Sequence, residues 1–101
     1  MYLSIDIKDE MIKLIQNRLV DFSEISKIIL FGSFPKSKNP NDIDIAIIQN
    51  SKDNYLTLSL KYRKALRELS KKIPLDVIPI KINTYSSFLE EINQGYVIYE
   101  K

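Results

Sequence analysis

The sequence has 101 residues, of which 45% are hydrophobic and 28% charged, and this balance indicates a small globular protein rather than a disordered or fibrous one. It contains no cysteine and no histidine, so disulfides, thiolate metal sites and imidazole catalysis are excluded, and a metal site must use oxygen ligands. Fifteen Lys and Arg against thirteen Asp and Glu leave a formal net charge of +2, too small to indicate a dedicated nucleic-acid binder.

Neither a targeting segment nor a membrane span is predicted. The N-terminus, Met1-Tyr2-Leu3-Ser4-Ile5-Asp6, does not have the pattern of a signal peptide, and no apolar run is long enough for a membrane span. We therefore expect a cytoplasmic protein that does not associate with membranes. Since no repeat, low-complexity stretch or linker interrupts the chain, residues 1–101 are expected to form one domain.

The first half of the chain predicts one helix and two strands. Residues 9–20 place their apolar side chains at helical spacing, namely Met11, Ile12, Ile15 and Leu19. Residues 27–31 form a nearly continuous apolar run that ends at Gly32, which is typical of a strand buried on both faces. Residues 42–48 alternate at first and then become fully apolar. We expect this second strand to be exposed at its start and buried at its end.

A long helix is predicted over residues 55–72. Its apolar stripe consists of Leu56, Leu60, Leu66 and Leu69, with Tyr62 and Ala65. The opposite face is basic, with Lys61, Arg63, Lys64 and Arg67. Such a face is usually solvated, and a contact with protein or RNA is the alternative.

The last part of the chain predicts a strand over residues 75–80, a helix capped by Thr84 that runs to Gln94 and stops at Gly95, and a terminal strand over 96–99. Because proline cannot donate a hydrogen bond to the sheet, Pro79 indicates either that this first strand lies at the edge of the sheet or that the strand ends there. The order implies an α/β or α+β fold with a small mixed sheet of three to four strands, covered by helices mainly on one face.

Two aspartates open the second predicted strand. Because side chains alternate along a strand, Asp42 and Asp44 point to the same side and can share a divalent cation, which relieves their repulsion. The alternative is that Asn39-Pro40-Asn41-Asp42 is only a turn and Asp44 lies on a solvated edge. The residues by themselves leave both interpretations open.

A third carboxylate and a glycine turn add to this pattern. Asp76 is the only charged residue in an apolar strand, so it needs a partner, which is either a metal ion or a nearby lysine. Gly32-Ser33 follows the first strand, where the backbone can turn sharply and offer amides to a phosphate, and where the serine can cap a following helix. Lys36 lies in the same loop and either contacts triphosphate oxygens or is solvated.

These motifs resemble the signature of the DNA polymerase β-like nucleotidyltransferase superfamily, and more narrowly the minimal nucleotidyltransferases. The resemblance rests on Leu30-Phe31-Gly32-Ser33-Phe34 followed by Asn41-Asp42-Ile43-Asp44-Ile45-Ala46, on Leu75-Asp76-Val77, and on Gly95-Tyr96-Val97-Ile98-Tyr99-Glu100 near the C-terminus. It covers nearly the whole chain and implies the nucleotidyltransferase fold.

The resemblance also implies roles for individual residues. Asp42 and Asp44 would bind two Mg²⁺ ions, with Mn²⁺ as the alternative, and Asp76 would help to bind a metal and activate the attacking hydroxyl. Gly32 and Ser33 would hold the triphosphate of ATP. The family often has a small residue, an arginine and a glycine after Gly-Ser-Phe, where this chain has Pro35-Lys36-Ser37 in a shorter loop. Lys36 can replace the charge of that arginine but not its bidentate geometry.

Many minimal members act as antitoxins of HEPN-domain ribonuclease toxins and transfer AMP from ATP to a toxin tyrosine. The resemblance therefore implies a magnesium-dependent protein adenylyltransferase with a HEPN-type partner. Two alternatives remain. The protein is either a non-catalytic module that neutralises a HEPN partner by binding it, or a nucleotidyltransferase that acts on a small molecule or RNA. Self-association into a homo-oligomer is not decided by the sequence.

Overall fold

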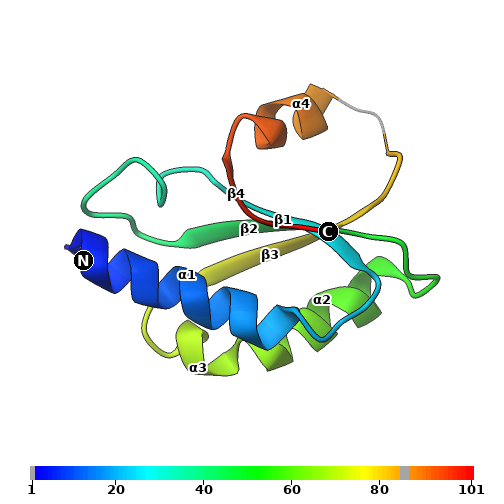
Figure 1. Cartoon of the computed structure of the whole chain (residues 1–101), viewed down its shortest axis with the longest axis horizontal. Helices are drawn as coiled ribbons and strands as arrows, with labels where there is room; N and C mark the ends of the chain where they lie inside the picture. The colour runs from blue at the N-terminus through cyan, green and yellow to red at the C-terminus, as the bar shows by residue number, and fades with distance from the viewer. Residues whose placement is uncertain (1, 85–86) are drawn as a thin grey trace.

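The computed structural model describes residues 2–84 and 87–101 (Figure 1). Its elements follow the predicted order: α1 (Ile5–Leu19), β1 (Ile25–Phe31), β2 (Ile43–Gln49), α2 (Tyr55–Ala65), α3 (Arg67–Ser70), β3 (Leu75–Lys81), α4 (Ser87–Asn93) and β4 (Tyr96–Glu100). The strands form a four-stranded sheet in the order β3-β2-β1-β4. β1 is antiparallel to β2 and β4, whereas β2 and β3 are parallel. The predicted α+β class with a small mixed sheet is confirmed.

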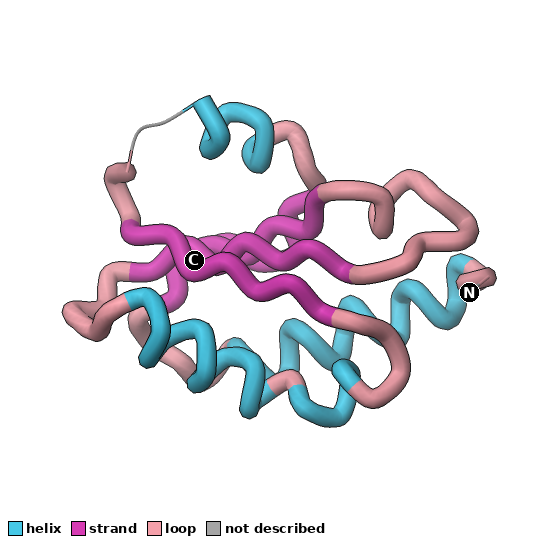
Figure 2. The backbone as a smooth tube through the Cα atoms, turned by 180° about the vertical axis from the view of Figure 1, so that it is seen from behind, coloured by secondary structure: helices cyan, strands magenta, loops and turns pink. Residues whose placement is uncertain are grey.

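The helices cover the two faces of the sheet unequally. Figures 1 and 2 show α1, α2 and α3 beneath one face and the short α4 over the other. The larger core includes Ile28 and Leu30 of β1 and Ile43, Ile45 and Ile47 of β2. A smaller core on the α4 side is formed by Ile29, Ala46 and Ile92, with Phe31, Ile48 and Ile80 packed against it. β1 is thus buried on both faces, as predicted.

The first helix starts earlier than its apolar pattern indicates. α1 begins at Ile5, because the Ser4 hydroxyl caps it by accepting a hydrogen bond from the Ile7 amide at 3.2 Å. The prediction began at Asp9, since the first buried residue of the helix is Met11 and the preceding turn faces solvent. Apolar periodicity does not detect a helical turn that buries nothing.

The predicted long helix is interrupted, and two of the six residues of its predicted apolar stripe are wrong. Leu66 leaves the helical conformation, with φ −99° and ψ 17°, and separates α2 from α3. Leu56 and Leu60 are exposed, at 66% and 59%, whereas α2 buries Leu58, which was not predicted, and Tyr62, which was. Both pairs have the same i, i+4 spacing, so contact with the sheet decides which one faces inward.

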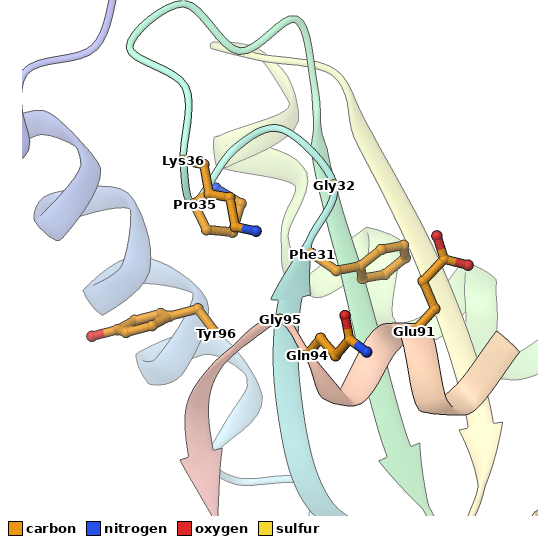
Figure 3. A pocket seen from close by; sticks show the side chains of 8 residues that line it. All are labelled: Phe31, Gly32, Pro35, Lys36, Glu91, Gln94, Gly95 and Tyr96. Atoms are coloured by element: carbon orange, nitrogen blue, oxygen red, sulfur yellow. The ribbon is translucent and has the colours of Figure 1, made fainter. Parts of the chain in front are cut away.

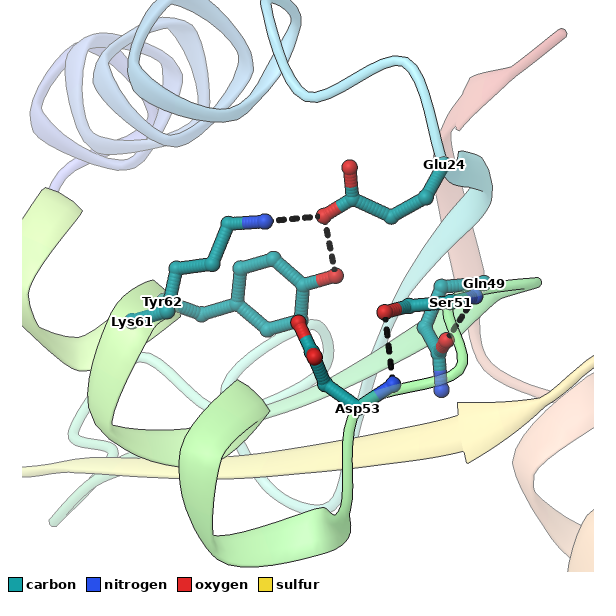
Figure 4. Close-up of polar contacts among 6 residues, drawn as sticks. All are labelled: Glu24, Gln49, Ser51, Asp53, Lys61 and Tyr62. Atoms are coloured by element: carbon teal, nitrogen blue, oxygen red, sulfur yellow. Dashed lines mark hydrogen bonds and ion pairs between the residues drawn. The ribbon is translucent and has the colours of Figure 1, made fainter.

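A partly buried polar cluster connects α2 to the start of β1 (Figure 4). The Glu24 carboxylate accepts hydrogen bonds from Lys61 Nζ at 2.8 Å and from the Tyr62 hydroxyl at 2.9 Å. Burial opposes ionisation of Glu24, but the hydrogen bonds from Lys61, the backbone and Tyr62 prevail and leave its pKa below the ordinary value. Burial, followed by the bond to Glu24, raises the pKa of Tyr62. The cluster fixes the position of α2 beneath the sheet.

The end of the chain supplies the fourth strand. β4 pairs with β1, which confirms the predicted terminal strand, and Pro79 lies in the outer strand β3, as its missing donor requires. The predicted capping of α4 from Thr84 involves Tyr85 and Ser86, which lie outside the described residues. α4 ends as predicted before Gly95, whose amide donates to the Ile92 carbonyl at 2.8 Å. A Cβ at Gly95 would lie 2.5 Å from the Leu30 carbonyl oxygen, so only glycine fits there.

Candidate active site

The glycine after β1 is in direct contact with one of the predicted carboxylates. Gly32 has a φ of +71°, a left-handed conformation that other residues rarely adopt. A Cβ at this position would lie 2.1 Å from Oδ2 of Asp44. Gly32 is therefore required both for the turn and for the space that the Asp44 carboxylate occupies.

Strand pairing brings the three predicted aspartates together. Asp44 of β2 is the register partner of Asp76 in β3, and Asp42 lies just before β2, which begins at Ile43. Burial, followed by the charges of Asp42 and Asp76, raises the pKa of Asp44. Asp42 and Asp76 therefore both lie within electrostatic range of Asp44.

Asp76 also has a cationic neighbour. Its side chain is 59% exposed, and its Oδ1 lies 3.8 Å from Nη2 of Arg63 in α2. The predicted ion-pair alternative is thus present, with an arginine in place of a lysine. Because β3 is the outer strand, solvent also reaches Asp76, so this charge is not confined to an apolar environment.

The carboxylates are not arranged as a preformed metal cage. Within residues 2–84 and 87–101, no three His, Cys, Asp or Glu side chains are gathered closely enough to hold a metal ion. The donor set of three carboxylates nevertheless suits a hard divalent cation. Asp76 would have to turn from Arg63 toward Asp44 to join such a site, so the metal-binding role of the three aspartates stays a prediction.

The loop after Gly32 consists of turns. The Ser33 carbonyl accepts hydrogen bonds from the amides of Lys36, at 3.2 Å, and Ser37, at 2.8 Å, but no helix continues from this turn. Two further carbonyls, those of Phe34 and Ser37, accept hydrogen bonds from Lys8 Nζ in α1. The expectation that Ser33 caps a following helix is therefore wrong, because a side chain takes the carbonyls that a continued helix would use.

A cavity of about 480 Å³ opens beside this loop (Figure 3). It is lined by Phe31, Gly32, Pro35, Lys36, Glu91, Gln94, Gly95 and Tyr96. Two predicted nucleotide-binding residues, Gly32 and Lys36, lie on its wall, whereas Ser33 and the three aspartates do not. The contact between Gly32 and Asp44 joins the cavity to the carboxylates. The volume of the cavity is in the range of small-molecule sites.

The sequence did not point to the residues of the opposite wall. Glu91, Gln94 and Tyr96 come from the end of α4 and the start of β4, more than fifty residues along the chain from Gly32. Only the pairing of β4 with β1 brings them to the loop, where Leu30 is the register partner of Tyr96. The sequence predicted a terminal strand at this position, but it did not predict how that strand pairs with β1, and the pairing determines which residues line the cavity.

Among the described residues, no helix combines the length and the apolar character needed to span a membrane.

A comparison with curated proteins found no match. A comparison with solved structures found chains of the same fold in several toxin–antitoxin complexes. A mutant of the MntA-HpeT toxin–antitoxin matches with a TM-score of 0.56 and 21% identity, over 93% of this chain and 72% of the other.

Two further solved structures match at similar levels. A toxin–antitoxin with AMP-PNP gives a TM-score of 0.55 and 21% identity, over 93% of this chain and 73% of the other. The tri-AMPylated HEPN toxin of Shewanella oneidensis in complex with its MNT antitoxin gives 0.50 and 24%, over 93% and 70%. At these identities the likeness shows a shared fold.

The family comparison covers most of the chain. The model of the family described as "Polymerase beta, Nucleotidyltransferase" matches residues 13–101, a range that contains Gly32 and all three aspartates of the site. This match agrees with the nucleotidyltransferase fold that the motifs predicted. The chain therefore belongs to the polymerase beta nucleotidyltransferase family.

Proposed function

We propose that the protein is a magnesium-dependent nucleotidyltransferase that transfers AMP from ATP to a tyrosine hydroxyl of a HEPN-type toxin, and so acts as an antitoxin. The observation that carries this proposal is the contact between the left-handed turn at Gly32 and the carboxylate of Asp44. It joins a loop suited to phosphate with a group of aspartates suited to a cation. Structures of similar fold contain AMP-PNP in one case and an AMPylated HEPN toxin in another.

Asp42 and Asp44 are the proposed ligands of two Mg²⁺ ions, with Mn²⁺ as the alternative. Their mutual repulsion contributes to the raised pKa of Asp44, and a bound divalent cation would relieve it. Bound magnesium would neutralise charge on the triphosphate and on the departing pyrophosphate. Asp44 is held in place by the Gly32 turn and by its position in β2, so one ligand is already oriented.

Asp76 is proposed to receive the proton of the attacking tyrosine hydroxyl and to assist in metal binding. The tyrosine oxygen bonds to the α-phosphorus, the bond from that phosphorus to the bridging oxygen of pyrophosphate breaks, and the proton passes to the carboxylate. The exposure of Asp76 on the outer strand suits an acceptor that arrives on another polypeptide. The ion pair between Arg63 and Asp76 must open before Asp76 can accept the proton.

The Gly32 loop and its cavity are proposed to bind ATP. Among the described residues, the amide of the exposed Ser33 donates no hydrogen bond, so it can donate to a phosphate oxygen. Lys36 lies on the wall of the cavity and adds a positive charge. The cavity is large enough for the rest of the nucleotide.

One observation favours a second candidate, a non-catalytic antitoxin that acts by binding. Asp76 is paired with Arg63, and the described residues contain no preformed group of three metal ligands. In a protein without catalysis, this pair would be a permanent surface ion pair and the partner would be neutralised by complex formation alone.

Labelled ATP, magnesium and a HEPN protein from the same genome will separate the two candidates. The wild type is compared with an Asp42→Asn, Asp44→Asn double variant and with Asp53→Asn, an exposed aspartate in the loop before α2, as a matched control. AMP found by mass on the HEPN protein with wild type and control, but not with the double variant or with EDTA, supports the adenylyltransferase. A stable complex without transfer from any nucleotide would leave the binding antitoxin.

A further inference from the structure

We propose that Lys8 is a positioning residue that holds the Gly32–Ser37 loop in the conformation that receives the triphosphate. This inference rests on the proposed function, because it assigns a task to a residue outside the motifs. Lys8 lies in α1, far along the chain from the loop, and is partly buried.

The side chain of Lys8 contacts the loop at three points. Its Nζ donates a hydrogen bond to the Phe34 carbonyl at 2.6 Å and another to the Ser37 carbonyl. The ammonium group also lies 5.2 Å from the centroid of the Phe34 ring, within the range of a cation–π interaction. Phe34 itself is 1% exposed and belongs to the larger core. A single lysine therefore connects α1 to the loop and to the core residue that anchors it.

These contacts orient the peptide groups of the loop. A segment that binds an anion must present amide N–H groups to it and turn carbonyl oxygens away. The Ser33 carbonyl is satisfied within the loop by the amides of Lys36 and Ser37. The carbonyls of Phe34 and Ser37 are satisfied by Lys8. All three of these oxygens are thus engaged, and within the described part of the chain the amide of the exposed Ser33 donates no hydrogen bond and remains for phosphate.

Besides Lys8, the loop is held by the hydrogen-bonded turn at Ser33 and by the burial of Phe34. Residues 32–42 contain no helix or strand, and their far end is tethered to the N-terminal segment by the hydrogen bond from the Leu3 amide to the Lys38 carbonyl, at 2.8 Å. Gly32, Ser33 and Lys36 are exposed. Without the ammonium group, the carbonyls of Phe34 and Ser37 would lose their donor and could rotate toward the site, where they would repel phosphate oxygens.

The test compares Lys8→Met, Lys8→Arg and the control Lys13→Met, an exposed lysine of the same helix. Methionine keeps the length and apolar stem of the side chain but no donor, whereas arginine keeps the charge and donors. Binding of magnesium-bound AMP-PNP is measured by calorimetry, KM and kcat for AMP transfer are measured with a HEPN partner, and melting temperatures are recorded for every variant.

We expect Lys8→Met to weaken AMP-PNP binding and raise the KM for ATP about tenfold or more, while kcat at saturating ATP stays within about twofold. Lys8→Arg should recover most of the affinity, and Lys13→Met should match the wild type. A loss of folded protein that lowers kcat and leaves KM unchanged would show a merely structural role. If Lys8→Met does not fold, Lys8→Leu, which also lacks a donor, replaces it and should show the same rise in KM.

Failure of the inference is distinguishable from failure of the proposed function. If the wild type binds AMP-PNP and transfers AMP, and Lys8→Met does so with unchanged affinity, Lys8 has no positioning role and the proposed function stands. If the wild type itself neither binds AMP-PNP nor transfers AMP, the proposed function is overturned and the inference falls with it.

Discussion

Replacing Gly32 by alanine adds one methyl group at the point where the loop meets the carboxylates. The new Cβ would lie 2.1 Å from Oδ2, 3.2 Å from Cγ and 3.6 Å from Cβ of Asp44. Two separate penalties follow. The left-handed φ of +71° costs an L-residue about 1–2 kcal/mol. In addition, the Asp44 carboxylate must leave its present rotamer, which costs about 0.5–1.5 kcal/mol. We therefore expect Gly32→Ala to lower the free energy of unfolding by about 2–3 kcal/mol.

Only the second penalty depends on Asp44, so a double-mutant cycle separates the two. In an Asp44→Ala background, the nearest remaining atom of residue 44 to the new methyl group is Cβ at 3.6 Å, which is an ordinary contact. Gly32→Ala should then cost only the backbone term, about 1–2 kcal/mol. The coupling energy between the two positions is expected to be about 1 kcal/mol.

The free energy of unfolding is measured for wild type, Gly32→Ala, Asp44→Ala and the double variant by urea unfolding followed by far-ultraviolet circular dichroism. These four values give the coupling energy. A difference of about 1 kcal/mol corresponds to about 4–8 °C in melting temperature for a chain of this size, so thermal unfolding offers a second measurement. A coupling energy within about 0.3 kcal/mol of zero would refute the contact between the Gly32 turn and the Asp44 carboxylate. In the proposed function, Gly32→Ala also displaces a metal ligand, so AMP transfer should fall at least about tenfold at temperatures where the variant is folded.

Three further predictions concern packing and charge. Leu58→Ala should lower the free energy of unfolding by about 2–4 kcal/mol, because Leu58 is 2% exposed, whereas Leu56→Ala, at a position 66% exposed, should change it by less than about 0.5 kcal/mol; urea titrations distinguish them. Glu24→Gln and Tyr62→Phe should each cost about 1–3 kcal/mol, since the first removes the charge that accepts from Lys61 and Tyr62 and the second removes one hydrogen bond of this partly buried cluster. The pKa of Glu24 is below its ordinary value of 4.5, so its stabilisation is complete above that pH and is lost as the pH falls through the lower folded value. Urea midpoints of wild type and Glu24→Gln should therefore converge on acidification. Arg63→Gln should change stability by less than about 0.5 kcal/mol, because both partners of its ion pair are about half exposed.

The elements of the fold were predictable from the sequence because each carries a local signal. The apolar run before Gly32 and the alternation that starts at Asp42 predicted β1 and β2 to within a few residues. The face of α2 was predicted only in part, since Tyr62 was placed correctly in the buried stripe and Leu58 was missed. Leu56 and Leu60 have the same spacing as Leu58 and Tyr62, and the sheet selected the second pair. Helical spacing defines a stripe, but a helix with two candidate stripes needs its packing partner to decide between them.

The residue types of the candidate site were taken from the sequence and their roles stay a prediction, whereas the geometry of the site was only partly predictable. Alternation along a strand is sufficient to place Asp42 and Asp44 on one side of the sheet. The pairing of Asp44 with Asp76 follows from the parallel register of β2 and β3, which a crossover through two helices sets. Arg63 is positioned by the same crossover. The pairing of Asp44 with Asp76 and the contact of Asp76 with Arg63 depend on tertiary packing. Neither contact can be derived from the local sequence around these residues.

The topology explains why residues from four separate segments converge at one end of the sheet. β1 runs antiparallel to β2, so the C-terminal end of β1, with Gly32, lies beside the start of β2, with Asp44. β3 is parallel to β2, and its start therefore brings Asp76 to the same end. β4 is antiparallel to β1, which places its first residue, Tyr96, beside the end of β1 from the other side. The carboxylates thus depend on the β1–β2–β3 pairings, whereas the wall of the cavity depends on the β1–β4 pairing. Substitutions in the turn before β4 can therefore reshape the cavity without moving the aspartates. In the proposed function, nucleotide preference and metal binding would then be structurally separable.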